Sequence, residues 1–192
     1  MVKLIVFDFD DTLFFTTSAH AKSYTRAIFE VLKVYVSEQL IEKEIKAGAV
    51  FPDFLTILPS ELSNDLAMEI HRRKNEIYQE TLIDIQVNES IANNLPDISS
   101  KCFTAIWSNS SRANIDLLLS KHNLSFFFHL IYSREDFRYR KPDTESYKAL
   151  CAKFSVPVQE SMLVDDSNVN LEAINRIGAI GVLPSNFNAS SF

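Results

Sequence analysis

Five short apolar runs constrain the fold of this 192-residue chain more than any other feature of its sequence. Each run has the length of a strand, and segments with the apolar spacing of helices separate the last four. Such alternation predicts a parallel sheet that helices cover on both faces. The predicted strands are residues 4–7, 103–107, 129–132, 162–164 and 179–183.

The long interval after the first predicted strand has a different character. Residues 18–83 contain no convincing strand, while apolar residues recur there at helix-like intervals. The apolar sets are Ala27, Ile28, Val31 and Leu32, then Leu62, Leu66, Met68 and Ile70. A loop marked by Gly48, Pro52 and Pro59 divides the two sets. The chain is therefore expected to form one sheet domain with a helical cap inserted after the first strand.

Composition limits the expected partners and location. The net charge of −6 and the pI near 5.2 argue against broad nucleic-acid or anionic-membrane binding, which depends on a positive surface field. The longest apolar stretches fall far short of the roughly 20 residues that span a bilayer. The apolar residues 4–7 are followed directly by aspartates, which a secretory signal would not have. Cys102 and Cys151 fit no disulfide framework or metal-ligand spacing. We therefore expect a cytoplasmic protein without a membrane or nucleic-acid partner, and the oligomeric state stays open.

Polar residues gather where predicted strands end. Residues 108–111 offer N-cap oxygens for a following helix. Pro142 is expected at the first position of another helix. Asn168 or Asn170 precedes a third helix, which should stop at Gly178. Because open parallel sheets place their ligands at the carboxyl ends of strands, these clusters predict a binding site there.

Two acidic groups also follow predicted strands. Asp8, Asp10 and Asp11 come directly after the first strand, and Asp165 and Asp166 come after the fourth. Asp8 and Asp10 lie two residues apart, so in an extended segment their side chains project to the same side. Clustered carboxylates are costly unless hydrogen bonds or a cation satisfy them, and a hard divalent cation with oxygen ligands would relieve their repulsion. If the two strands are neighbours, both groups converge on one metal.

Four ordered motifs carry these polar residues. They are residues 7–13 (FDFDDTL), 106–109 (IWSN), 140–143 (RKPD) and 163–167 (LVDDS), the last with Asn170. Their order and residue types resemble the haloacid dehalogenase-like (HAD) hydrolase superfamily, in the subgroup with a helical cap after the first strand. The resemblance spans nearly the whole chain. It implies an α/β fold: a Rossmann-like doubly wound parallel sheet from residues 1–14 and 86–192, with an inserted small α-helical cap at residues 15–85.

The resemblance also implies a magnesium-dependent phosphatase that hydrolyses a small phosphorylated metabolite. Asp8 would attack phosphorus and form an aspartyl-phosphate intermediate. Asp10 would protonate the leaving oxygen and then activate the water that hydrolyses the intermediate. Mg²⁺ would be held by Asp8, the main-chain carbonyl of Asp10 and Asp166, with Asp165 as an additional ligand.

The same resemblance assigns phosphate binding to the second and third motifs. Ser108 and Lys141 would bind the phosphoryl oxygens, helped by amides at a helix N-terminus. Asn109 is a further candidate for phosphate binding, and it could instead orient Asp10 or Ser108. Taken alone, Ser108 could be only an N-cap, and Lys141 could be a solvated surface cation.

Several alternatives stay open. A phosphomutase would pass the phosphoryl group to a second hydroxyl instead of water, and an interaction module would keep the fold without turnover. A dehalogenase is disfavoured because the resembling dehalogenases lack the second aspartate that Asp10 provides. The substrate also stays open, because the cap sequence matches no specific pocket. Four positions depart from the superfamily's common pattern: Asp11, Phe15, Asp165 and Asn170.

Overall fold

The computed structural model describes residues 1–47, 57–58 and 62–189, and the chain divides into two compact units. One unit comprises Met1–Phe14 and Val87–Phe192, and the other comprises Phe15–Gln86. Gln86 therefore lies in the second unit, whereas the sequence analysis placed it in the sheet domain. The loop predicted around Gly48, Pro52 and Pro59 lies outside the described residues, apart from positions 57 and 58.

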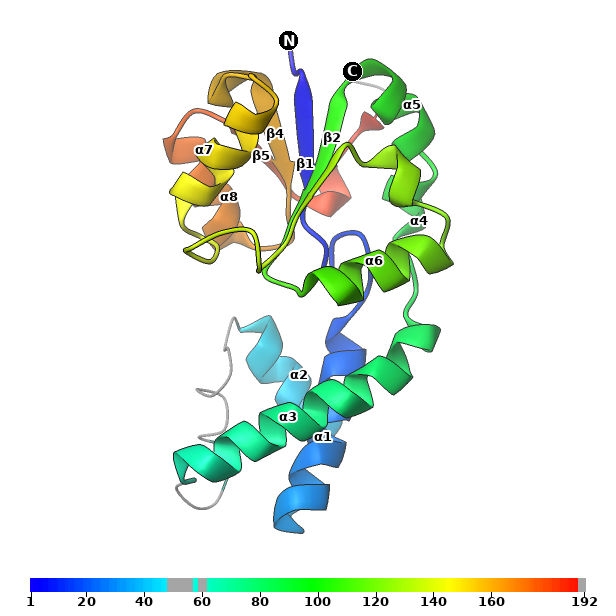
Figure 1. The fold of residues 1–192 in the computed structure, drawn as a ribbon, viewed down its shortest axis with the longest axis vertical. Helices are drawn as coiled ribbons and strands as arrows, with labels where there is room; N and C mark the ends of the chain where they lie inside the picture. The colour runs from blue at the N-terminus through cyan, green and yellow to red at the C-terminus, as the bar shows by residue number, and fades with distance from the viewer. Residues whose placement is uncertain (48–56, 59–61, 190–192) are drawn as a thin grey trace. The chain divides into compact units, whose positions relative to one another are not determined.

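The first unit contains a five-stranded parallel sheet with the strand order β3-β2-β1-β4-β5. Figure 1 labels β1, β2, β4 and β5, with β1 and β2 side by side. The predicted parallel α/β fold is confirmed, with each strand within two residues of its expected bounds. The strands are β1 Leu4–Phe7, β2 Phe103–Trp107, β3 Leu130–Tyr132, β4 Ser161–Val164 and β5 Ile180–Val182. All four residues of β1 are buried, as expected for the central strand of a sheet with two covered faces.

Helices cover both faces of this sheet. Alternate residues of β1 point to opposite faces, and Leu4 and Val6 join a core cluster with side chains of α7 and α8. Figure 1 shows α7 and α8 on one side of the sheet and α5 and α6 on the other. The helices of this unit are α4 Glu89–Ala92, α5 Leu95–Lys101, α6 Arg112–Lys121, α7 Thr144–Lys153 and α8 Asn168–Arg176.

The helix starts differ in detail from the sequence-based expectations. Ser111 is the N-cap of α6, where its hydroxyl accepts a hydrogen bond from the Asn114 amide at 3.4 Å. Asp143 is the N-cap of α7, because its carboxylate accepts a bond from the Glu145 amide at 2.9 Å. The prediction that Pro142 is the first residue of α7 is therefore wrong, since the proline precedes the cap.

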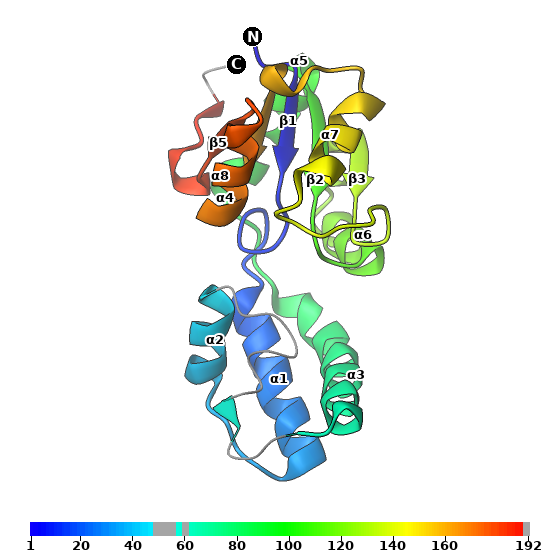
Figure 2. The same ribbon diagram turned by 90° about the vertical axis from the view of Figure 1, so that its left-hand side faces the viewer.

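The second unit is helical. It contains α1 Thr17–Leu32, α2 Glu38–Lys46, α3 Asn64–Thr81 and the short 3₁₀ helix η2 Leu82–Asp84. Helix α1 packs against both α2 and α3 (Figure 2). Ile28 of α1, Ile41 of α2 and Ile70 of α3 are fully buried at these contacts. Leu66 and Met68 are exposed, because α3 turns a different face, with Ile70 and Ile77, toward the core. No helix in the described ranges is both long and apolar enough to cross a membrane.

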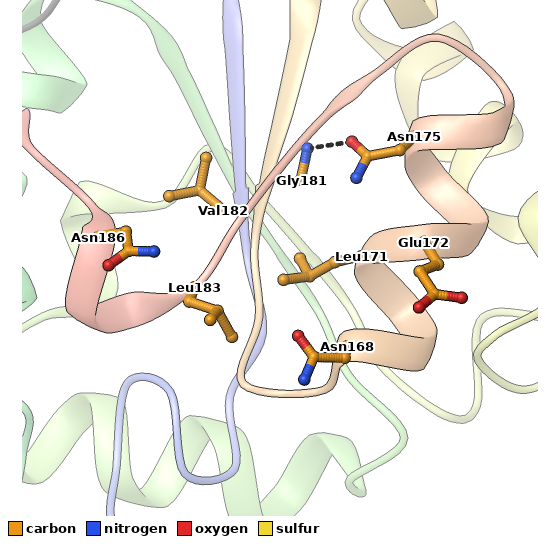
Figure 3. Close-up of a pocket in the computed structure, with 8 residues that line it drawn as sticks. All are labelled: Asn168, Leu171, Glu172, Asn175, Gly181, Val182, Leu183 and Asn186. Atoms are coloured by element: carbon orange, nitrogen blue, oxygen red, sulfur yellow. Dashed lines mark hydrogen bonds between the residues drawn. The ribbon is translucent and has the colours of Figure 1, made fainter.

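The outer edge of the sheet carries a small cavity. It has a volume of about 380 Å³ and lies between α8 and β5, with Leu171, Val182 and Leu183 among its lining (Figure 3). The amide oxygen of Asn175 accepts a hydrogen bond from the Gly181 N–H at 2.8 Å, which ties the helix to the edge strand. This contact satisfies one backbone donor that the edge strand would otherwise present to solvent.

Candidate active site

Strand register brings the two acidic motifs together. Phe7 at the end of β1 pairs with Val164 at the end of β4, so Asp8 and Asp165 follow at the same edge of the sheet. The Asp8 amide donates to the Val164 carbonyl at 2.9 Å, and both aspartates are buried. The neighbouring strand β2 pairs with β1 on its other side. The strands β1 and β4 are therefore neighbours, as convergence of the two acidic groups requires.

Lys141 links these two strand ends. Its Nζ atom lies 2.6 Å from Asp8 Oδ1 and 2.8 Å from Asp165 Oδ2, and its side chain is 3% exposed. The ammonium also lies 4.7 Å from the centroid of the Trp107 ring, close enough for a cation–π interaction. The alternative that Lys141 is a solvated surface cation is wrong, because carboxylates and an aromatic face surround it.

The negative charges around Lys141 outnumber its single positive charge. Burial raises the pKa of Asp8 well above its usual range; Lys141 opposes this rise, while the charges of Asp165 and Asp10 reinforce it. Burial disfavours the charge on Lys141, but Asp165 and Asp8 outweigh this effect and raise the pKa of its ammonium. One ammonium thus faces several carboxylates, and the excess negative charge suits an additional cation.

Asp165 is engaged by several hydrogen-bond donors of the protein itself. Its Oδ1 accepts hydrogen bonds from the Ser167 amide at 2.9 Å and the Asn170 side chain at 3.0 Å. Its Oδ2 accepts from Lys141 at 2.8 Å and again from Asn170 at 3.1 Å. A carboxylate offers about four lone-pair positions, so these donors occupy Asp165. In this arrangement Asp165 holds Lys141 in place, and Asn170, a departure from the family pattern, holds Asp165.

A metal ion fits the residues at this edge. Carboxylate oxygens of Asp8, Asp165 and Asp166 all lie within 4.8 Å of one another. Asp166 is exposed, and its amide donates to the Thr12 hydroxyl at 3.1 Å. Desolvation and then the charges of Asp165 and Asp11 raise the pKa of Asp166 to about 6. Because Asp165 is engaged by other donors, Asp8 and Asp166 are the side chains best placed to ligate a hard cation.

The segment after β2 reaches the same edge. Ser108 is buried, and its amide donates to the Tyr132 carbonyl at 3.1 Å. The side-chain oxygen of Asn109 accepts from the Lys141 amide at 3.2 Å, so Asn109 contacts the third motif. Asp10 accepts a hydrogen bond on Oδ2 from the Ser110 hydroxyl.

The structure thus gathers six of the predicted residues, which we call the strand-end site: Asp8, Asp10, Ser108, Lys141, Asp165 and Asp166. Ser110, Thr12 and Trp107 were missed as contacts of this site. The sequence offered a signal for each of them: Thr12 and Trp107 lie inside the first two motifs, and Ser110 lies two residues after Ser108 among the N-cap candidates.

Solved structures with the same fold come from several bacteria. A putative phosphoglycolate phosphatase from Lactobacillus plantarum has a TM-score of 0.81 at 15% identity, covering 100% of this chain and 92% of that one. CbbY from Rhodobacter sphaeroides, solved with phosphate, has a TM-score of 0.78 at 20% identity over 95% and 86% of the two chains. A subfamily IA HAD-superfamily hydrolase from Geobacter sulfurreducens has a TM-score of 0.75 at 19% identity over 95% and 89%.

These identities are low, so the likeness to solved structures shows the fold alone. The family assignment comes from the sequence, because a family model described as haloacid dehalogenase-like hydrolase matches residues 5–182. That match includes the four motifs and every member of the strand-end site. The chain belongs to the haloacid dehalogenase-like hydrolase family.

Proposed function

We propose that this protein is a magnesium-dependent phosphatase that hydrolyses a small phosphorylated metabolite through an aspartyl-phosphate on Asp8. The observation that carries the proposal is the buried ammonium of Lys141, held 2.6 Å from Asp8 and 2.8 Å from Asp165. A fixed cation beside a buried carboxylate suits the attack of that carboxylate on an anionic phosphoryl group.

The nucleophile is oriented by its neighbours. Its amide is bonded to β4, and its carboxylate is bonded to Lys141, so Asp8 has little freedom to rotate. Such restraint lowers the entropy cost of reaching the attacking geometry. Bound Mg²⁺, with Asp8, Asp166 and the Asp10 carbonyl as its protein ligands, would supply positive charge at the phosphoryl group.

Asp10 would act as the general acid and base. It protonates the leaving oxygen while Asp8 attacks, and it later takes a proton from the water that hydrolyses the intermediate. Ser108 and Lys141 would hold the phosphoryl oxygens, and Asn109 supports the Lys141 main chain. A carbon–halogen bond needs no such acid, so the presence of Asp10 favours a phosphatase over a dehalogenase.

Two of the similar structures support this direction by their names. One is a putative phosphoglycolate phosphatase, and CbbY was solved in complex with phosphate. We extend the reaction class, and not their substrates, to this chain. A small phosphorylated metabolite is the proposed substrate class.

The test is release of inorganic phosphate from a panel of esters that includes phosphoglycolate, glycerol phosphate, several sugar phosphates and para-nitrophenyl phosphate. We expect release with Mg²⁺ and none after addition of a chelator. Asp8→Asn should abolish release, whereas Asp97→Asn, the same change at an exposed position of α5, should not. Phosphate release by Asp8→Asn at the wild-type rate would rule out the assigned nucleophile. Isomerised substrate without phosphate release would indicate a phosphomutase.

A further inference from the structure

Ser110 makes a contact that the proposed roles of Ser108 and Asn109 leave unexplained. Its hydroxyl donates a hydrogen bond to Asp10 Oδ2 across a sequence separation of 100 residues. Its amide donates to the Ser108 hydroxyl oxygen at 3.0 Å, and its carbonyl accepts from the Arg134 amide at 3.1 Å. Ser110 therefore touches both the proposed acid–base residue and a proposed phosphate ligand.

The main chain of Ser110 is held on both sides of its α-carbon. With its amide and carbonyl both bonded, only the χ1 rotation decides where the Ser110 hydroxyl points. A serine loses little side-chain entropy when that single rotation is fixed. The Ser110 hydroxyl is thus a rigid donor that can hold the Asp10 carboxylate in one orientation.

Helix capping does not account for this serine. The N-cap of α6 is Ser111, whose hydroxyl accepts the Asn114 amide, while the Ser110 hydroxyl points to Asp10. The two adjacent serines therefore have separate tasks, one in the helix and one at the site. Their separation also supplies a matched control for mutagenesis.

We propose that Ser110 is a positioning residue that holds the Asp10 carboxylate in the orientation needed for proton transfer. The inference rests on the proposed phosphatase function, because it acts through Asp10. General acid–base catalysis contributes about 10²- to 10⁴-fold to a rate, so losing the orientation without losing the carboxylate should cost about 10- to 100-fold.

The test compares two leaving groups. An alkyl phosphate from the panel needs its leaving oxygen protonated, whereas para-nitrophenol is acidic enough to leave as an anion. We expect Ser110→Ala to lower kcat/KM for the best alkyl phosphate about 10- to 100-fold and for para-nitrophenyl phosphate by no more than about threefold. Ser110→Thr keeps the hydroxyl and should restore most of the loss. Ser111→Ala should affect both substrates equally and weakly.

A second arm places Ser110→Ala in an Asp10→Asn background. If Ser110 works through Asp10, the added change should leave kcat/KM of the Asp10→Asn protein within about twofold, since the two effects are not independent. Equal losses on both leaving groups, no rescue by threonine, or full additivity with Asp10→Asn would each overturn the inference. A wild-type protein without activity on any ester would overturn the proposed function, and this inference with it. An active wild type whose kcat/KM is unchanged by Ser110→Ala would overturn the inference alone.

Discussion

Lys141 is a cation held in a buried environment in the first unit. It is buried, and it pairs with two carboxylates and an aromatic ring at once. Removing one partner of a buried ion pair destabilises a protein more than replacing the whole pair with apolar side chains does, because the remaining charge stays buried without a partner. The site therefore depends on this side chain for charge balance and, in the proposed function, for phosphate binding.

We predict that Lys141→Met lowers the free energy of unfolding by about 3 kcal/mol at neutral pH and kcat/KM by at least about a hundredfold. The stability loss should shrink as the pH falls, because Asp8, whose pKa is already raised, then takes up a proton. Thermal unfolding at two pH values checks this. Lys148→Met is the control, since its pair with Glu145 is exposed and should contribute less than about 1 kcal/mol. Equal losses in the two variants would contradict the prediction.

At the scale of elements, the site depends on how strands and helices meet. The pairing of Phe7 with Val164 sets Asp8 beside Asp165, and a slip of one residue would turn one of them away. Helix α8 begins two residues after Asp166, at Asn168, and packs on β4 and β5. Its placement therefore bears on the acidic pair, and Gly181 in β5 lies close to Leu171 and Asn175 of this helix.

A side chain at position 181 has no room. A Cβ atom there would lie 3.0 Å from the Leu171 carbonyl oxygen and 3.1 Å from the Leu171 Cβ. We predict that Gly181→Ala lowers the free energy of unfolding by about 1–3 kcal/mol, because α8 must move away from the sheet. Asn175→Ala should cost about 1 kcal/mol through loss of its bond to the Gly181 amide.

Urea unfolding of these variants checks both values. Asn186→Ala is the comparison, because this residue lines the same cavity but belongs to the 3₁₀ helix after β5. It should unfold at nearly the same urea concentration as the wild type. A Gly181→Ala protein as stable as the wild type would show that α8 is not closely packed on β5.

For the whole molecule, the strand-end site lowers the free energy of unfolding at neutral pH when no metal is bound. The pKa of Asp166 is raised from 3.8 to about 6, and that of Asp8 is raised too, so in the metal-free protein these groups bind protons more tightly when folded than when unfolded. At pH values between the pKa of 3.8 and the raised pKa of about 6, Asp166 carries more protons in the folded state than in the unfolded state, so the free energy of unfolding rises as the pH falls. Glu30 and Glu69, with lowered pKa values, act in the opposite sense.

We therefore predict a difference between wild type and Asp166→Asn. Without metal at about pH 7, Asp166→Asn should have the higher melting temperature, and the gap should close toward about pH 5 as Asp166 is protonated. Saturating Mg²⁺ should raise the melting temperature of the wild type only, and a chelator should reverse this. Differential scanning calorimetry measures both effects. Metal stabilisation of Asp166→Asn equal to that of the wild type would remove Asp166 from the ligand set.

The sequence by itself determined the parallel sheet, the family and the acidic strand ends, because each is encoded locally. A short apolar run predicts a buried strand from its own residues, and a motif such as residues 7–13 is contiguous in the sequence. The tertiary structure alone decided which partner each polar group takes. Lys141 meets Asp8 across 133 residues, Ser110 meets Asp10 across 100, and Asn170 occupies Asp165. Such contacts depend on strand register and side-chain rotamers, which no short stretch of sequence specifies.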